Sequence, residues 1–135
     1  MNRLFKTTLL IALLSFPFSF LLAQQKEMMI RIAEIEVFPG YIEEYNALLR
    51  EEAEASVRLE RGVFAIFPMR LQDNPALLRI VEIYANQEAY QLHLKTAHFL
   101  KYKKGTLKMV KNLKLLDMQA IDSESMSRIF QKIGK

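Results

Sequence analysis

Residues 63–85 read VFAIFPMRLQDNPALLRIVEIYA, two apolar runs separated by a polar turn. The runs, Val63 to Arg70 and Leu77 to Ala85, are rich in aliphatic and aromatic residues, which favour strands. Asp73, Asn74 and Pro75 between them are residues that favour turns. The stretch therefore predicts a β-hairpin.

A strand and a helix are predicted before this hairpin. Residues Met28 to Phe38 are rich in Ile, Val and Met and end at the turn signal Pro39-Gly40. Apolar residues then recur at helical spacing, with charged residues on the other face, until Gly62 supplies a stop. The apolar members of this predicted helix are Ile42, Tyr45, Leu49, Ala53 and Val57.

A helical region, a strand and a last helix are predicted after the hairpin. Asn86 begins the helical region, and Thr96 is placed to cap a second helical segment that ends before Asn112. Leu113 to Ile121 follows as a strand. A short amphipathic helix is predicted at the C-terminus, where Met126, Ile129, Phe130 and Ile133 follow an i, i+3, i+4, i+7 pattern.

The element order β-α-β-β-α-β is that of a ferredoxin-like α+β unit, with both helices on one face of an antiparallel sheet. We assign residues 24–121 to this domain and 122–135 to the C-terminal helix. Large apolar groups occupy both faces of the two hairpin strands, although a strand with one wet face alternates apolar and polar residues. A homodimer that covers the second sheet face is therefore expected.

The N-terminal segment has the layout of a secretory signal peptide. Arg3 and Lys6 precede an apolar stretch from Leu9 to Leu22, and Ala23 precedes a polar run. We expect cleavage after Ala23 and a periplasmic or secreted protein, with retention of the segment as an uncleaved anchor as the alternative. The chain has no cysteine, so neither a lipid anchor nor disulfides are expected, and no stable membrane anchor is expected after cleavage.

The charge balance argues against a nucleic-acid partner. The chain carries a net charge of +4, and loss of the segment with Arg3 and Lys6, which contains no acidic residue, would leave +2. A nearly neutral domain is a poor candidate for binding a polyanion.

Residues 80–90 read IVEIYANQEAY and residues 93–99 read HLKTAHF. This segment closely resembles the core signature of the antibiotic biosynthesis monooxygenase family, whose members form dimeric α+β barrels. The resemblance extends to the Pro39-Gly40 turn, the Glu-rich first helix, the Gly62-Val63 strand start and the hairpin turn. It covers nearly all of the chain after the signal peptide.

The resemblance implies a cofactor-free monooxygenase, without metal or flavin, that acts on a quinol or similar aromatic small molecule in the cell envelope. Such chemistry requires a deprotonated phenol in a dry apolar pocket, and therefore a base. The family's second histidine lies beside the pocket just before Phe99, which makes His98 the candidate base or orienting group. A structural histidine that caps a backbone group is the alternative.

Glu82 is the second candidate catalytic residue. It stands between Ile80 and Tyr84 on one face of a strand, where a charge is costly without a partner. A raised pKa would allow it to accept a substrate proton. Alternatively, Glu82 pairs with a nearby histidine or lysine and holds the second helix.

Candidate substrate-binding residues are His93, Tyr84, Phe99 and Tyr102, which together suit a flat aromatic substrate, although aromatic residues at these spacings also suit a plain core. His93 and His98 are five residues apart, which is neither i+3 nor i+4 on a continuous helix, so we expect no metal site.

Other activities of the same fold fit the sequence less well. The haem-degrading branch would place a tryptophan near His93 and a haem-ligating histidine near Lys103, and neither is present. A non-catalytic dimeric module that binds a small hydrophobic ligand stays open as the alternative, since fold alone does not establish function.

Overall fold

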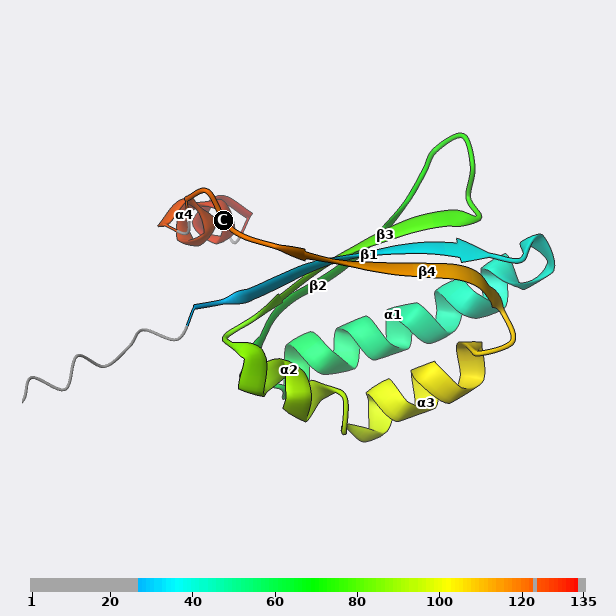
Figure 1. The fold of residues 1–135 in the computed structure, drawn as a ribbon, viewed down its shortest axis with the longest axis horizontal. Coiled ribbons are helices and arrows are strands. Elements are labelled where there is room, and N and C mark those ends of the chain that lie inside the picture. The colour runs from blue at the N-terminus through cyan, green and yellow to red at the C-terminus, as the bar shows by residue number, and fades with distance from the viewer. Residues whose placement is uncertain (1–26, 123, 134–135) are drawn as a thin grey trace, which may run out of the picture.

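The computed structural model describes residues 27–122 and 124–133. Four antiparallel strands form one sheet in the order β2-β3-β1-β4. Figure 1 shows α1, α2 and α3 together on one face of this sheet. The arrangement confirms the expected ferredoxin-like α+β fold. The elements are β1 (Met29–Val37), a 3-10 turn (Pro39–Tyr41), α1 (Ile42–Leu59), β2 (Val63–Arg70), β3 (Leu77–Tyr84), α2 (Gln87–His93), α3 (Ala97–Thr106), β4 (Val110–Met118) and α4 (Glu124–Ile133).

Local sequence signals account for most element boundaries. The β2–β3 hairpin closes as expected, with the Ala76 amide donating to Asn74 Oδ1 at 3.2 Å. The side chain of Asn86 caps α2, and that of Thr96 caps α3. The last strand differs, since β4 runs from Val110 to Met118 rather than from Leu113 to Ile121. No Gly or Pro marks its start, so the sequence pattern alone gave no boundary there.

The core lies between the sheet and the helices. Alternate residues of β1 and β3 face α1 and are almost fully buried, because successive side chains of a strand point to opposite faces. Tyr45 and Leu49 of α1 pack against them. The buried strand residues of this layer are Ala33, Ile35, Val37, Val63, Ile66, Leu78, Ile80 and Tyr84.

The opposite face of the sheet is an apolar surface that no helix among α1, α2 and α3 covers (Figure 1). The strand register places its side chains in rows across the sheet. One row is Phe67, Val81, Ile32 and Leu116, and the next is Ala65, Ile83, Ile30 and Met118. On the other side, the first row is bordered by a more polar row, in which Arg79 pairs with Glu34 at 3.1 Å. We call the first two rows the open apolar face.

The position of α2 is fixed by a close contact at the start of β2. Gly62 lies against Ala89 of α2, and a Cβ atom on Gly62 would lie 2.5 Å from the Ala89 Cβ. The carbonyl of Gly62 also accepts a hydrogen bond from the Ala85 amide at 2.8 Å. This close approach requires glycine at position 62, because a side chain there would clash with Ala89, and it holds α2 close to the start of β2.

The C-terminal helix α4 lies beside the end of β4, apart from α1, α2 and α3 (Figure 1). The predicted C-terminal helix is present, but its Ile129 is half exposed, and the side chains of Phe130 and Ile133 lie outside the described ones. The expected signal peptide, residues 1–23, also lies outside the described residues. Among the helices that are described, none is long and apolar enough to cross a membrane.

Candidate functional site

A cavity of about 570 Å³ lies between the sheet and the helices. Its walls are largely apolar, and they come from all four strands on one side and from α1, α2 and α3 on the other. Leu113 and Leu115 of β4 line it and are about half exposed, at 54% and 48%. The cavity therefore reaches solvent beside β4. Its volume is that of a site for a small organic molecule.

Most of the residues expected at a substrate site line this cavity. His93, Tyr84, Phe99, Tyr102 and Glu82 are all in its wall. The aromatic rings pack edge to face or tilted, as with Phe99 against His93 at 4.8 Å between centroids. Burial raises the pKa of the Tyr84 and Tyr102 phenols, which keeps both neutral hydrogen-bonding groups. Tyr102 also shares a 2.5 Å hydrogen bond with the hydroxyl of Tyr45.

Glu82 points into the cavity from β3. Its Oε2 accepts a hydrogen bond from the Tyr84 hydroxyl at 2.9 Å. Burial raises the pKa of the Glu82 carboxyl, while the bond from Tyr84 and the charge of Arg31 act in the opposite direction. Its partners are thus a tyrosine and an arginine rather than the histidine or lysine considered from the sequence. The partly buried position agrees with both interpretations of Glu82.

Glu52 is a cavity residue that the sequence analysis did not single out. It lies on the inner face of α1, only 4% exposed, and its Oε1 accepts a hydrogen bond from Ser56 at 2.8 Å. Burial raises its pKa to about 7, against the hydrogen bond from Ser56. The signal was available, because Tyr45, Leu49, Glu52 and Ser56 share one helix face at i, i+4, i+7 and i+11. Val57, assigned to the apolar face, is instead half exposed.

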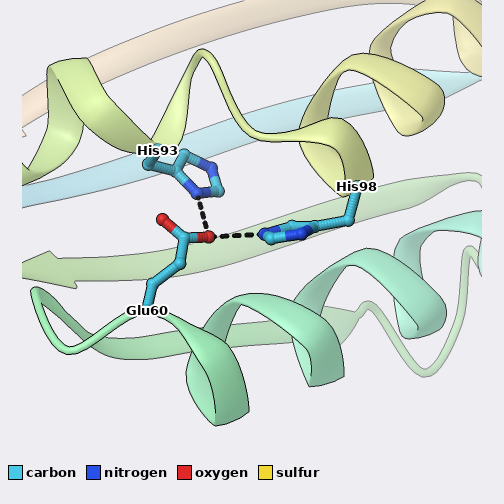
Figure 2. Close-up of side chains that lie close together, drawn as sticks. All are labelled: Glu60, His93 and His98. Atoms are coloured by element: carbon cyan, nitrogen blue, oxygen red, sulfur yellow. Dashed lines mark hydrogen bonds and ion pairs between the residues drawn. The ribbon is translucent and has the colours of Figure 1, made fainter.

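His98 does not line the cavity but lies just outside it, in a cluster with Glu60 and His93 (Figure 2). Oε1 of Glu60 is 3.0 Å from Nδ1 of His93 and 2.6 Å from Nε2 of His98. The side chain of His93 is 3% exposed, that of Glu60 13% and that of His98 17%. The cluster therefore leads from the cavity wall toward the surface.

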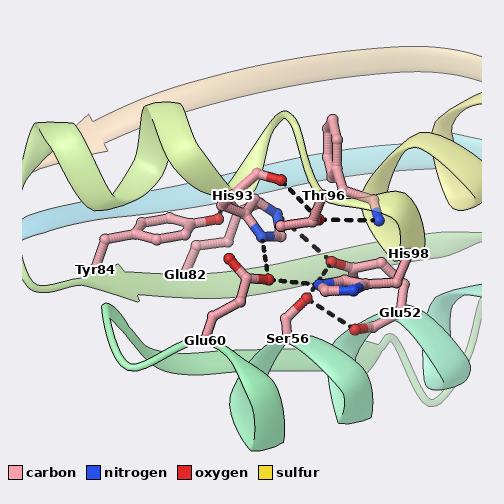
Figure 3. Close-up of polar contacts among 9 residues, drawn as sticks. Glu52, Ser56, Glu60, Glu82, Tyr84, His93, Thr96 and His98 are labelled. Carbon is pink, nitrogen blue, oxygen red and sulfur yellow. Dashed lines mark hydrogen bonds and ion pairs between the residues drawn. The ribbon is translucent and has the colours of Figure 1, made fainter.

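The helix break between α2 and α3 brings the two histidines together. The α2 helix ends at His93, whose carbonyl accepts hydrogen bonds from both the amide and the hydroxyl of Thr96. Thr96 then caps α3, whose first turn carries His98 (Figure 3). The expectation of no metal site rested on the spacing of His93 and His98 along one continuous helix, and the break between α2 and α3 removes that premise.

The cluster has the chemistry of a metal-ligand set as well as that of a hydrogen-bonded group. Glu60, His93 and His98 each offer one ligand atom, and these atoms lie within 4.8 Å of one another. Two histidines and a carboxylate are a common donor set for zinc. However, each of these atoms already has a hydrogen-bond partner, and in the described part of the chain no buried side-chain nitrogen or oxygen lacks one.

Comparisons with known proteins agree on one family. Residues 28–105 match the family described as antibiotic biosynthesis monooxygenase. A structure from Bacteroides thetaiotaomicron VPI-5482 with the same family description is 44% identical, with a TM-score of 0.70, over 71% of this chain and 91% of that chain. No curated protein matches the chain.

Two further structures are similar at lower identity. A monooxygenase structure from Lactobacillus acidophilus NCFM is 29% identical with a TM-score of 0.68, and the match covers 70% of this chain but 45% of that one. A structure from Nitrosomonas europaea, again with the family description, is 20% identical over 70% of this chain and 99% of that chain, with a TM-score of 0.66. At this identity, the last likeness concerns the fold alone.

The buried carboxyl of Glu52 predicts that stability depends on pH. Its pKa is about 7 in the fold and 4.5 ordinarily, so the folded chain binds this proton more tightly, and stability falls as pH rises from about 4.5 to about 7. Glu52→Gln keeps an acceptor for Ser56 but cannot ionise. We expect it to raise the free energy of unfolding by about 3 kcal/mol at about pH 8, at 1.36 kcal/mol per pKa unit, and little at about pH 4.

Urea unfolding at both pH values measures this difference. Glu44→Gln, an exposed substitution in the first turn of the same helix, is the control and should change stability little at either pH. Equal destabilisation by Glu52→Gln at both pH values would contradict the raised pKa.

Proposed function

Because the chain belongs to the antibiotic biosynthesis monooxygenase family, we propose that it is a cofactor-independent monooxygenase that oxidises a quinol or similar aromatic small molecule. The observation that carries the proposal is the apolar cavity with buried Glu52, buried His93 and partly buried Glu82 in its wall. Given the expected export of the chain, we place this reaction in the cell envelope.

The cavity wall suits a flat aromatic ring. Tyr84, Tyr90, Phe99 and Tyr102 supply ring faces and edges, and aliphatic side chains of β1, β3 and α1 complete the wall. Tyrosine hydroxyls and carboxylates are suited to hydrogen-bond the hydroxyl groups of a quinol. The low polarity of the surroundings strengthens such bonds and keeps competing water away from the reacting atoms.

The reaction needs little from the protein besides a base and a cavity. Loss of a hydroxyl proton gives a phenolate, which is electron-rich enough to pass an electron to dioxygen. For a hydroquinone, one atom of dioxygen enters the ring and the other leaves as water, giving a hydroxyquinone. The substrate supplies all four electrons, so the reaction balances without a further reductant.

Glu82 is suited to hold a substrate hydroxyl. Its Oε2 already accepts a bond from Tyr84, which leaves the other oxygen available to a ligand. Burial raises the pKa of this carboxyl and favours proton sharing with a phenol over a fully separated charge. Arg31 of β1, which also lines the cavity, offsets part of the charge that develops there.

A non-catalytic module that binds a small hydrophobic ligand is the second candidate. Its support is that the two carboxyl groups and the histidine of the cavity wall all have protein partners: Glu82 bonds Tyr84, Glu52 bonds Ser56, and His93 bonds Glu60. A binding module needs the cavity but no titratable group, whereas an oxygenase needs both.

Oxygen uptake by the full chain with a panel of hydroquinones separates these two functions. We expect uptake above the autoxidation of a protein-free control. Glu82→Gln keeps the acceptor for Tyr84 but loses the charge, and we expect it to lower kcat/KM by about 10- to 100-fold. Glu44→Gln, exposed on α1, should leave the rate unchanged. Oxygen uptake no faster than autoxidation across the panel would contradict the oxygenase proposal and favour the binding module.

We also propose that two copies pair through the open apolar face. Two complete rows of apolar side chains cross all four strands there, and Phe67 is 60% exposed. Soluble monomers rarely expose a continuous apolar surface of this extent. Pairing through the same patch on both copies gives a two-fold symmetric dimer and leaves the helices on the outside.

The measured mass of the chain in solution tests this pairing. Light scattering after gel filtration should give twice the chain mass, and Phe67→Lys should shift it to the mass of one chain by placing like charges in the interface. Leu59→Lys is the matched control, because Leu59 is equally exposed at 59% but lies at the end of α1. A dimer that survives Phe67→Lys would contradict pairing through this face.

A further inference from the structure

We propose that Nε2 of His93 is the proton acceptor of the cavity, and that Glu60 and His98, outside the cavity, are positioning residues that hold His93 in the tautomer required. The acceptor role of His93 rests on the proposed function, whereas the positioning role of Glu60 and His98 concerns the protein without substrate. The proposal moves the base from His98, which the sequence favoured, to the histidine in the cavity wall.

The ring of His93 stands between two carboxylates of α1. Its Nδ1 is 3.0 Å from Glu60, on the outer side, and its Nε2 is 3.5 Å from Oε1 of Glu52, which lines the cavity with it. One edge of the ring therefore faces the surface cluster and the other faces the cavity. Figure 3 shows His93 with Glu52 and Glu60 around it.

The charge state of Glu60 determines where His93 carries its proton. Burial alone would raise the pKa of Glu60, but the hydrogen bonds from His98 and His93 outweigh it, and the net shift is downward. An ionised carboxylate only accepts hydrogen bonds, so Nδ1 of His93 must be the donor. Burial lowers the pKa of His93, partly offset by Glu60, so the ring is neutral and Nε2 keeps a free lone pair.

His98 holds Glu60 from the solvent side. Its Nε2 donates to the same oxygen, Oε1, that accepts from His93, at 2.6 Å. Glu60 is the C-terminal cap residue of α1, where the chain leaves the helix, so its side chain needs such a contact to stay in one place. Partners of this outer kind orient and tune a histidine without touching the substrate.

The groups around His93 come from every element packed against it. From α1 these are Glu52 and Glu60, and from α3 His98. From β3, the Tyr84 ring lies 5.4 Å away between centroids. Glu60 is the close anion that can offset a positive charge on His93, because Glu52 has a pKa of about 7 and is partly protonated at neutral pH.

The proton step is balanced within the reaction. The substrate O–H bond breaks and an Nε2–H bond forms on His93, while Nδ1–H stays bonded to ionised Glu60. The imidazolium then returns the proton to the oxygen atom that leaves as water, and Nε2 regains its lone pair. This is the arrangement by which a buried carboxylate orients a catalytic histidine in acyl-transfer enzymes.

Nitrogen NMR of the imidazole rings tests the positioning role directly in the full chain without any substrate. The chain has two histidines, so the spectrum holds two rings, and His98→Gln identifies them. We expect His93 at neutral pH to carry its proton on Nδ1, with Nε2 unprotonated. His98→Gln retains a donor toward Glu60 and should preserve this tautomer, whereas Glu60→Leu, which has no acceptor for Nδ1–H, should abolish it.

Steady-state kinetics on the same variants test the acceptor role. Glu60→Leu and His98→Ala are expected to lower kcat by about 10- to 100-fold, His98→Gln to recover part of the His98→Ala loss, and Glu44→Gln to have no effect. If Glu60 controls the tautomer of His93 but the wild type shows no oxygen uptake, the positioning role is supported. The oxygenase proposal and the acceptor role of His93 are then both overturned.

Two results would overturn the positioning role. One concerns the His93 ring, either protonated on Nε2 in the wild type or with its tautomer unchanged by Glu60→Leu. The other is one-to-one binding of Zn²⁺ that moves both imidazole signals and is lost in His98→Ala, because a metal ion would replace the protons on which the tautomer depends.

Discussion

The break between α2 and α3 is the constraint on which the candidate site depends. On a continuous helix, His93 and His98 would point roughly 140° apart, since each residue turns the helix by about 100°. The end of α2 at His93 and the cap by Thr96 instead turn both rings toward Glu60. The contact of Gly62 with Ala89 holds α2 close to the start of β2, so that His93 at the end of α2 lies within reach of Glu60.

Short-range signals in the sequence predicted most of the fold. The strand β2 begins and ends at the residues expected, because a glycine stop and a turn-forming stretch bound it. Asn86 and Thr96 act as caps, as expected from their side-chain chemistry. The start of β4 at Val110 could not be predicted in the same way, since no turn residue separates it from α3 and pairing with β1 determines it.

The site was predictable only in part, and the reason lies in tertiary contacts. The aromatic residues and Glu82 follow from strand alternation and from the family resemblance, and all of them line the cavity. Helical spacing places Glu52 on the buried face of α1 and so distinguishes it from Glu51 and Glu54. Glu60, at the C-terminal cap of the helix, follows no such pattern, and its contacts with the two histidines are tertiary. Only the three-dimensional position of the helix break shows that His93 lies in the cavity wall and His98 outside it.

The proposed chemistry requires that a hydroxylated ring binds in the cavity with one hydroxyl at His93. A crystal structure of the full chain with a hydroquinone, grown without dioxygen, measures this directly. We expect a ring between the sheet and α3, with one hydroxyl oxygen about 2.6–3.2 Å from Nε2 of His93. A ring bound outside the cavity, or a hydroxyl placed at His98 on the solvent side of Glu60, would contradict it.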